Sequence, residues 1–244
     1  MTTQYKQKNH AAVPTTLIVG GTSGLGLELA RQIYDGALSD NILSAADIHI
    51  TGRKDPDEFG IQYHELNIEP CDAKLGEKLD ALIADTPYID HFIYAAGIAQ
   101  RQLIQDVSDA DIDLMNMIGL RVPQMLLGRI LRSQHELPGF VAISSVTQSV
   151  PRLEEAHYAA SKAGLRMFAE SASKNPRVKK TMVAAPAGMQ TPFWRNHSSV
   201  NAQPFLSAIQ VANDILCLYV EKPFVYKEIV IGRSPYSINV IHDR

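Results

Sequence analysis

A tyrosine and a lysine stand four residues apart in the stretch EEAHYAASKAGLRMF, residues 154–168. Because residues four apart project from the same face of a helix, Tyr158 and Lys162 are expected to lie side by side. A lysine ammonium beside a phenol stabilises the phenolate and lowers the tyrosine pKa from its usual value of about 10. A tyrosine tuned in this way can exchange a proton with a substrate oxygen near neutral pH. The alternative is that both are ordinary exposed helix residues.

Two polar residues earlier in the chain extend this pattern. Ser145 ends the apolar run FVAISS, residues 140–145, which predicts a strand whose carboxyl end lies at the ligand-binding edge of a sheet. Asn116 lies within a predicted helix, where asparagine is mildly unfavourable, so a structural role would require a surface position or a polar partner. Asn116, Ser145, Tyr158 and Lys162 are therefore the candidate catalytic residues.

The elements that must position these residues alternate regularly along the chain. Strands are predicted at 15–20, 48–51, 61–66, 91–96, 140–145, 181–185 and 228–232, and helices at 24–35, 72–85, 108–133, 155–173 and 205–220. This alternation, with strands apolar on both faces, predicts an α/β fold with a doubly wound parallel sheet of about seven strands covered by helices on both faces. With no visible seam in 244 residues, we expect a flexible leader at 1–14 and one domain over 15–244.

A glycine-rich turn follows the first predicted strand. The stretch LIVGGTSGLGLELARQ places Gly20, Gly24 and Gly26 between that strand and an amphipathic helix. A dinucleotide pyrophosphate needs backbone without Cβ atoms and free N–H groups at a helix N-terminus. The position at the first strand-to-helix turn favours a nucleotide site over a simple tight corner.

The end of the second predicted strand bears on the type of nucleotide. In NAD sites an acidic side chain at this point holds the ribose 2′-hydroxyl, whereas a nearby arginine suits the 2′-phosphate of NADP. In HITGRK, Gly52 occupies the expected acid position and Arg53 follows it, so the sequence favours NADP over NAD. The alternative is a solvated strand end in which Arg53 and Lys54 pair with nearby acids.

Composition and charge exclude several other classes. The net charge of −3 argues against nucleic acid or an anionic membrane as the main partner, because both require clustered Lys and Arg. No apolar run approaches the length of a membrane span. The two cysteines, Cys71 and Cys217, lie far apart and indicate a reduced, cytoplasmic protein. The eight histidines lack ligand spacing, so no metal is expected.

The ordered set GGTSGLG, YAAG, NMIG, AISS, YAASK and PAGMQT resembles the short-chain dehydrogenase/reductase family in its single-domain form, over roughly residues 15–235. The resemblance implies a Rossmann-like NAD(P)(H)-dependent oxidoreductase that interconverts a carbonyl and a secondary alcohol by hydride transfer. Tyr158 would be the general acid/base, Lys162 would bind the nicotinamide ribose and lower the tyrosine pKa, and Ser145 would hydrogen-bond the substrate oxygen. Asn116 would hold a water that relays protons to Lys162.

The resemblance also implies a cofactor site, a small-molecule substrate and a homodimer or homotetramer. The implied cofactor-binding residues are Gly20, Thr22, Ser23, Gly24, Leu25, Gly26, Arg53, Asn67, Ile68, Ala96, Gly97, Tyr158, Lys162, Pro186, Met189 and Thr191. A substrate loop at about 192–206 is expected to lie over the pocket, with Phe193 and Trp194 lining an apolar wall and Arg195 available to an anion. The alternative is that Arg195 is exposed to solvent and the two aromatic residues are ordinary packing.

The chain departs from the family pattern at several positions, which are Val19, Asn67, Tyr94, Ala95 and Ala187. These departures motivate a second hypothesis, a nucleotide-binding sensor or scaffold that keeps the fold without the reaction. A third, a sugar-nucleotide epimerase or dehydratase of the longer relatives, is disfavoured because the chain has no extra substrate domain and its glycine spacing differs.

Overall fold

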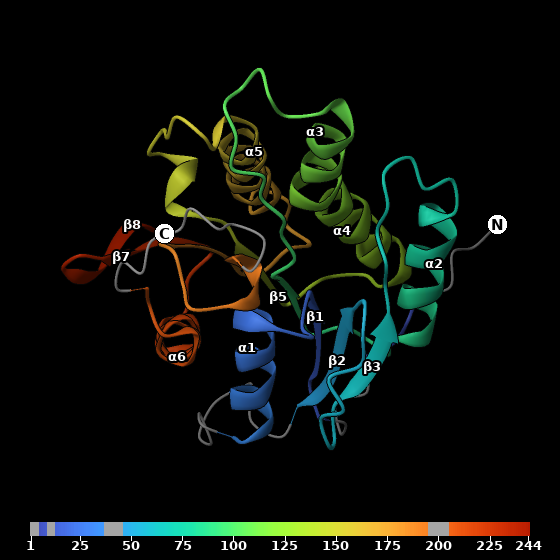
Figure 1. The fold of residues 1–244 in the computed structure, drawn as a ribbon. Helices are drawn as coiled ribbons and strands as arrows, with labels where there is room; N and C mark the ends of the chain where they lie inside the picture. The colour runs from blue at the N-terminus through green and yellow to red at the C-terminus, as the bar shows by residue number, and fades with distance from the viewer. Residues whose placement is uncertain (1–4, 9–12, 37–45, 195–204) are drawn as a thin grey trace.

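The computed structural model describes residues 5–8, 13–36, 46–194 and 205–244, which form one eight-stranded sheet between two layers of helices (Figure 1). The strand order is β3-β2-β1-β4-β5-β6-β7-β8. The parallel strands are β1 (Thr15–Val19), β2 (Asp47–Gly52), β3 (Gln62–Glu65), β4 (His91–Tyr94), β5 (Gly139–Ile143), β6 (Thr181–Pro186) and β7 (Tyr226–Arg233). The order reverses between β1 and β4, the topological switch point at which doubly wound sheets bind their ligands.

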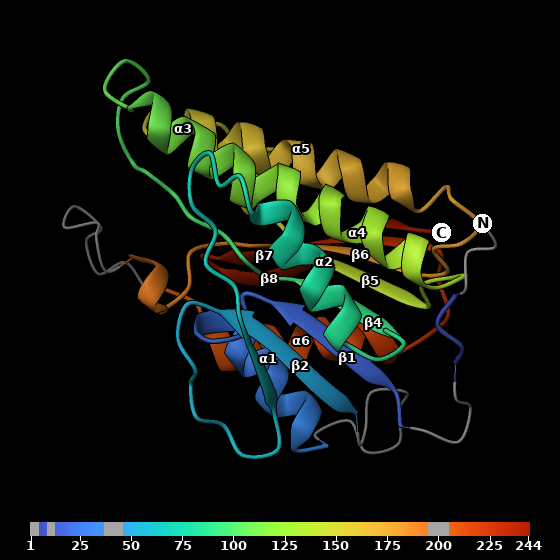
Figure 2. The same ribbon diagram turned by 90° about the vertical axis from the view of Figure 1, so that its right-hand side faces the viewer.

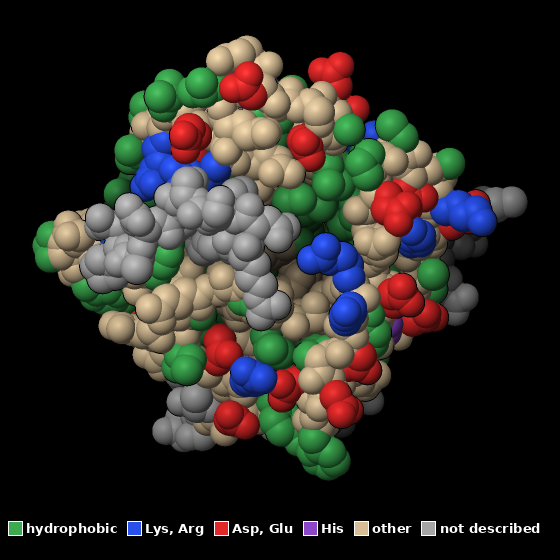
Figure 3. Space-filling model, viewed as in Figure 1, with side chains coloured by type: hydrophobic (Ala, Val, Ile, Leu, Met, Phe, Trp, Pro, Cys, Tyr) green, Lys and Arg blue, Asp and Glu red, His purple; other side chains and the backbone are tan. Residues whose placement is uncertain are grey.

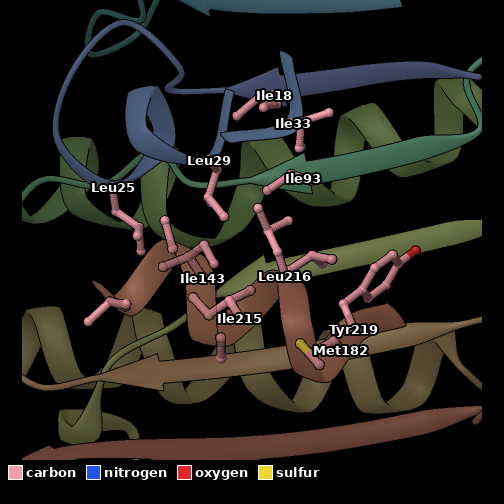
Figure 4. Close-up of a cluster of buried hydrophobic side chains, with 14 of the residues drawn as sticks. Ile18, Leu25, Leu29, Ile33, Ile93, Ile143, Met182, Ile215, Leu216 and Tyr219 are labelled. Atoms are coloured by element: carbon pink, nitrogen blue, oxygen red, sulfur yellow. The ribbon is translucent and has the colours of Figure 1, made fainter. Parts of the chain in front are cut away.

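The central strands β1, β4, β5 and β6 are buried along their whole length because helices cover both faces of the sheet (Figure 2). Helices α1 (Gly24–Tyr34) and α6 (Ala208–Val220) pack together on one face. Helices α2 (Leu75–Asp85), α4 (Val122–Ser133) and α5 (Ala156–Ala172) cover the other. Figure 4 shows the first layer, in which Leu29 of α1 and Leu216 of α6 meet over Ile93 of β4.

The sheet has one strand more than the sequence predicts. Strand β8 (Tyr236–Asp243) pairs antiparallel with β7 at the edge of the sheet. Its side chains are exposed or half-buried throughout, so the segment lacks the buried apolar run by which the other strands are recognised. The predicted count of about seven strands is corrected to eight for this reason.

The single long helix predicted over 108–133 is also corrected. The structure has α3 (Asp109–Asn116), a π-helical turn at Met117–Arg121, and then α4. Within the turn, Gly119 lies against α5, since a Cβ atom there would come within 2.7 Å of Ser161 Oγ. The absence of a side chain at Gly119 therefore allows the helix that carries Tyr158 and Lys162 to pack directly against the turn.

Part of the expected leader is held against the domain. The Lys6 N–H donates to Ser133 O at 2.7 Å, and the Lys6 ammonium donates to the carbonyls of Ile83 and Thr86. The described helices include none that combines the length and the apolar character of a membrane span.

Candidate active site

A cavity of about 620 Å³ lies at the carboxyl ends of β1, β2, β4, β5 and β6. Its walls come from the turns that follow these strands, from the start of α5 and from the segment after β6. Figure 3 shows the hollow near the centre of this face, with Lys and Arg side chains along one side of it. The parallel topology thus gathers residues from distant parts of the sequence at one edge of the sheet.

Tyr158 and Lys162 are both buried and both line this cavity. The Lys162 Nζ atom lies 5.9 Å from the centre of the Tyr158 ring. It donates a hydrogen bond of 2.9 Å to Ile143 O, and the Ser144 hydroxyl donates to Lys162 O at 3.1 Å. The end of β5 therefore fixes the lysine and its helix, and the predicted pair faces one cavity.

Ser145 lies two residues after the end of β5 and lines the same cavity as the tyrosine. Its Oγ accepts hydrogen bonds from Thr147 N–H at 3.3 Å and from Thr147 Oγ1 at 3.0 Å. It also lies near the Tyr158 phenol, whose pKa it lowers as a polar neighbour. Because both bonds from Thr147 use the oxygen as acceptor, the Ser145 proton is free to point toward the phenol oxygen.

The protonation of this centre differs from the sequence-based expectation. Burial raises the pKa of Tyr158, the Ser145 hydroxyl opposes that shift, and the Glu155 carboxylate adds to it. Burial likewise lowers the pKa of Lys162 to about 8. The expected lowering of the Tyr158 pKa by Lys162 is therefore not found here, because loss of hydration penalises both charged forms and the ammonium is directed at Ile143 O. At neutral pH the phenol is protonated, as a general acid must be.

Asn116 does not join the other three candidates. Its side chain is exposed, and it lies outside the cavity, whereas Leu114 and Ile118 line it. Residues two positions from a helical residue lie about 200° away around the axis, so Asn116 points away from the face that carries its neighbours. A polar group does reach this turn from the sheet, because the buried Tyr94 hydroxyl donates to Ile118 O at 2.5 Å.

The glycine turn forms a cradle for an anion. Gly20 and Gly24 have φ angles of +82° and +55°, and a Cβ atom on Gly26 would lie 2.1 Å from Gly20 O. Ser23 precedes α1 without making a side-chain capping bond, and the first turn of α1 contains no acidic residue. The N–H groups at the start of α1 thus remain available, and the cradle fits the pyrophosphate of a dinucleotide.

The end of β2 shows why no acidic residue stands there. A Cβ atom on Gly52 would lie 2.0 Å from Thr22 Oγ1, so a side chain at this position would require the Thr22 side chain to move. Arg53 lines the cavity beside it. Farther along, the Asn67 side-chain amide donates to Glu69 Oε1 at 2.8 Å.

The segment after β6 closes the other side of the cavity. Gln190 N–H donates to Leu206 O at 3.0 Å, and Leu206 N–H donates to Gly188 O at 3.0 Å. The ring of Phe193 lies 6.0 Å from that of Tyr158, centre to centre, so the predicted aromatic wall is present at this residue. The side chain of Trp194 and all of residues 195–204, including Arg195, lie outside the described part of the chain.

Every residue predicted to bind the cofactor lines the cavity. They are Gly20, Thr22, Ser23, Gly24, Leu25, Gly26, Arg53, Asn67, Ile68, Ala96, Gly97, Tyr158, Lys162, Pro186, Met189 and Thr191.

Four charged residues that the sequence analysis did not single out also line the cavity, namely Arg101, Arg152, Glu155 and Arg233. The Arg101 Nε atom lies 3.3 Å from Glu155 Oε1. Glu155 precedes Tyr158 by three residues, and this closeness in the chain is the available signal in the sequence. Arg101 reaches the site through the loop after β4, for which the sequence carries no comparable signal.

Comparisons with known proteins agree with this geometry. A family model described as short chain dehydrogenase matches residues 14–202. A search of curated proteins gave no match. Among solved structures, BdcA in complex with NADPH has 22% identity and a TM-score of 0.67, over 85% of this chain and 87% of that one.

Two further solved structures are similar. A short chain dehydrogenase from Burkholderia cenocepacia J2315 in complex with NADP has 19% identity and a TM-score of 0.68, over 87% of this chain and 92% of that one. A short-chain dehydrogenase from Sphingobium yanoikuyae in complex with NADPH has 19% identity and a TM-score of 0.69, over 84% of each chain. These likenesses show the fold, and the family model covers most of the sequence. The chain therefore belongs to the short chain dehydrogenase family of oxidoreductases.

Proposed function

We propose that this protein is an NADP(H)-dependent oxidoreductase that interconverts a carbonyl and a secondary alcohol. The observation that carries the proposal is the burial of Ser145, Tyr158 and Lys162 together in the same cavity as the glycine cradle. When bound, the nicotinamide supplies or accepts the hydride.

The residues of this chain handle the proton and the orientation of the substrate. In the reduction, the protonated Tyr158 phenol donates its proton to the carbonyl oxygen, and the Ser145 hydroxyl orients that oxygen by a hydrogen bond. The phenolate left behind is stabilised by the Lys162 ammonium, whose effect is strengthened by the low dielectric of the buried site. With a pKa of about 8, Lys162 is mostly charged at neutral pH. In the oxidation, the proton returns from the alcohol to Tyr158.

The cradle and the end of β2 support NADP(H) as the cofactor. The open N-terminus of α1 suits the pyrophosphate, and Arg53 suits a 2′-phosphate where Thr22 leaves no room for an acid at Gly52. The similar solved structures that contain NADP or NADPH are consistent with this choice.

Cofactor preference is tested by fluorescence titration with NADPH and NADH of the unmodified protein, Arg53→Ala and Lys54→Ala. Because a charge-assisted hydrogen bond contributes about 1.5–3 kcal/mol, Arg53→Ala should weaken NADPH binding about 10- to 100-fold and leave NADH binding unchanged. Lys54 is exposed and outside the cavity, so its removal is the matched control. Equal losses for both nucleotides, or none for NADPH, would contradict the assignment of Arg53.

The role of Tyr158 is tested by Tyr158→Phe, assayed on a panel of ketones and secondary alcohols. Loss of a general acid lowers turnover by roughly 10²- to 10⁴-fold, while NADPH affinity should be retained because the ring remains in place. Near-normal turnover in this variant would refute the enzymatic assignment. A protein that binds NADPH and turns over no member of the panel would support the sensor or scaffold alternative.

A further inference from the structure

The cavity contains a buried acid that the proposed chemistry does not use. Glu155 is 3% exposed, lines the cavity, and lies at the position directly before α5. Tyr158 follows it by three residues, and both side chains line the same cavity. The acid therefore stands one helical turn from the group that contacts the reacting oxygen.

Ion pairs hold the carboxylate of Glu155 in place, but they do not use all of its capacity to accept hydrogen bonds. Glu155 occupies the N-cap position of α5, and its side chain accepts no hydrogen bond from the first turn of the helix. Its Oε1 atom lies 3.3 Å from Arg101 Nε and 3.9 Å from Arg152 Nη1. The Arg101 contact is an ion pair rather than a hydrogen bond, because the buried Nε has no hydrogen-bond partner. Among the described residues, the other oxygen, Oε2, makes neither a hydrogen bond nor an ion pair.

The carboxylate of Glu155 is open to the cavity. It makes no hydrogen bond, yet neither of its oxygens is among the described polar atoms that are cut off from solvent and lack a partner, so it keeps contact with the space that it lines. Ala99, Val107, Met115 and Tyr158 form a separate buried apolar cluster against which Phe193 packs. A bound molecule that excludes water from this space leaves Oε2 unpaired unless it donates a hydrogen bond to it.

The charges around the site select the kind of donor. An anionic substrate would be repelled by Glu155, and an ammonium would be repelled by Arg101 and Arg152 within 4 Å of the same carboxylate. A hydroxyl carries a hydrogen to donate and no charge. We infer that Glu155 accepts a hydrogen bond from a substrate hydroxyl close to the reacting carbon, so that the substrate is a neutral hydroxylated ketone, aldehyde or polyol. The inference rests on the proposed oxidoreductase function.

Three ketones with the same carbon skeleton separate the possibilities: 1-hydroxybutan-2-one, butan-2-one and 2-oxobutanoate. We would measure kcat/KM with NADPH for the unmodified protein, Glu155→Gln and Glu154→Gln. The unmodified protein should prefer the hydroxyketone to butan-2-one by about 10- to 100-fold, because a buried acceptor rejects a substrate that leaves it unpaired. Glu155→Gln should reduce this preference about tenfold, since a neutral acceptor forms a weaker bond. An effect of the lost charge on the Tyr158 pKa should change kcat/KM for the hydroxyketone and for butan-2-one alike, so the ratio of the two is the quantity that tests the inference.

Glu154→Gln is the matched control. Glu154 pairs with Arg101 at 3.2 Å, but it does not line the cavity. Its removal should leave the preference intact, whereas a merely structural role of the ion pairs would make both variants lower kcat/KM for all ketones alike. If Glu155→Gln does not fold, Glu155→Asp keeps the charge, withdraws it from the cavity and should also lose the preference.

Several outcomes overturn the inference. They are equal kcat/KM for the hydroxyketone and butan-2-one, a preference for 2-oxobutanoate that Glu155→Gln increases, and turnover of none of the three. The first leaves the proposed function standing, provided that Tyr158→Phe abolishes turnover. A preference for 2-oxobutanoate would instead make Arg101 and Arg152 the substrate-binding groups. Retention of activity in Tyr158→Phe, by contrast, would defeat the proposed function itself.

Discussion

Replacing Lys162 by methionine should change the way in which stability depends on pH. Lys162 is 3% exposed, and burial lowers its pKa from 10.5 to about 8. Methionine keeps most of the volume of the aliphatic stem and removes the ionisable group. The lost hydrogen bond to Ile143 O is a pH-independent cost, so it cancels when the same pair of proteins is compared at two pH values.

The sign of the pH dependence follows from the protons that Lys162 binds in the folded and in the unfolded protein. Between pH 8 and 10.5 the unfolded lysine holds a proton that the folded one has released, so the free energy of unfolding of the unmodified protein rises with pH. Below pH 8 Lys162 is protonated in both the folded and the unfolded protein, so the full free-energy cost of burying its charge applies. With one pKa unit worth 1.36 kcal/mol, Lys162 destabilises the fold by about 3 kcal/mol at pH 7 and by about 1.4 kcal/mol at pH 9.5.

Urea unfolding of both proteins at pH 7 and pH 9.5, without cofactor, measures this quantity. The stability of the unmodified protein relative to Lys162→Met should improve by about 2 kcal/mol between the two pH values. Other groups that titrate in this range occur in both proteins, so their contributions cancel. A difference that stays constant, or that moves in favour of the variant at high pH, would refute the argument that burial controls the charge of Lys162.

Two further substitutions test the supports of the site. Gly26→Ala places a methyl group 2.1 Å from Gly20 O, so NADPH affinity should fall and the free energy of unfolding in urea should decrease by about 1–3 kcal/mol. Gly76→Ala in α2 is the control, because its methyl group meets nothing nearer than 3.4 Å and the change should be neutral or slightly stabilising. A Gly26→Ala variant with unchanged stability and affinity would contradict the cradle geometry. Tyr94→Phe removes the hydroxyl that donates to the Ile118 carbonyl and should lower the free energy of unfolding by about 0.5–1.5 kcal/mol. An unchanged urea midpoint would show that the bond does not support the π-helical turn.

Much of the fold and part of the site follow from the sequence alone. The alternation of buried β-branched runs with helical patterns predicts the parallel sheet, because those patterns depend on residues only a few positions apart. Once the sheet is parallel, the glycine turn, Ser145 and the start of α5 must meet at its carboxyl edge, as they do. The four-residue spacing of Tyr158 and Lys162 likewise determines that both face the same cavity.

The remaining features depend on contacts between distant segments. The π-helical turn contacts Ser161 of α5 at Gly119. Asn116 lies just before this turn with its side chain exposed, and a uniform helix over 108–133 does not predict that orientation. Arg101 meets Glu155 only because two loops are side by side in space. The direction of the Tyr158 pKa shift was mispredicted from the spacing, since the neighbouring ammonium is visible in the sequence while the burial that outweighs it arises only when the whole sheet and its helices pack.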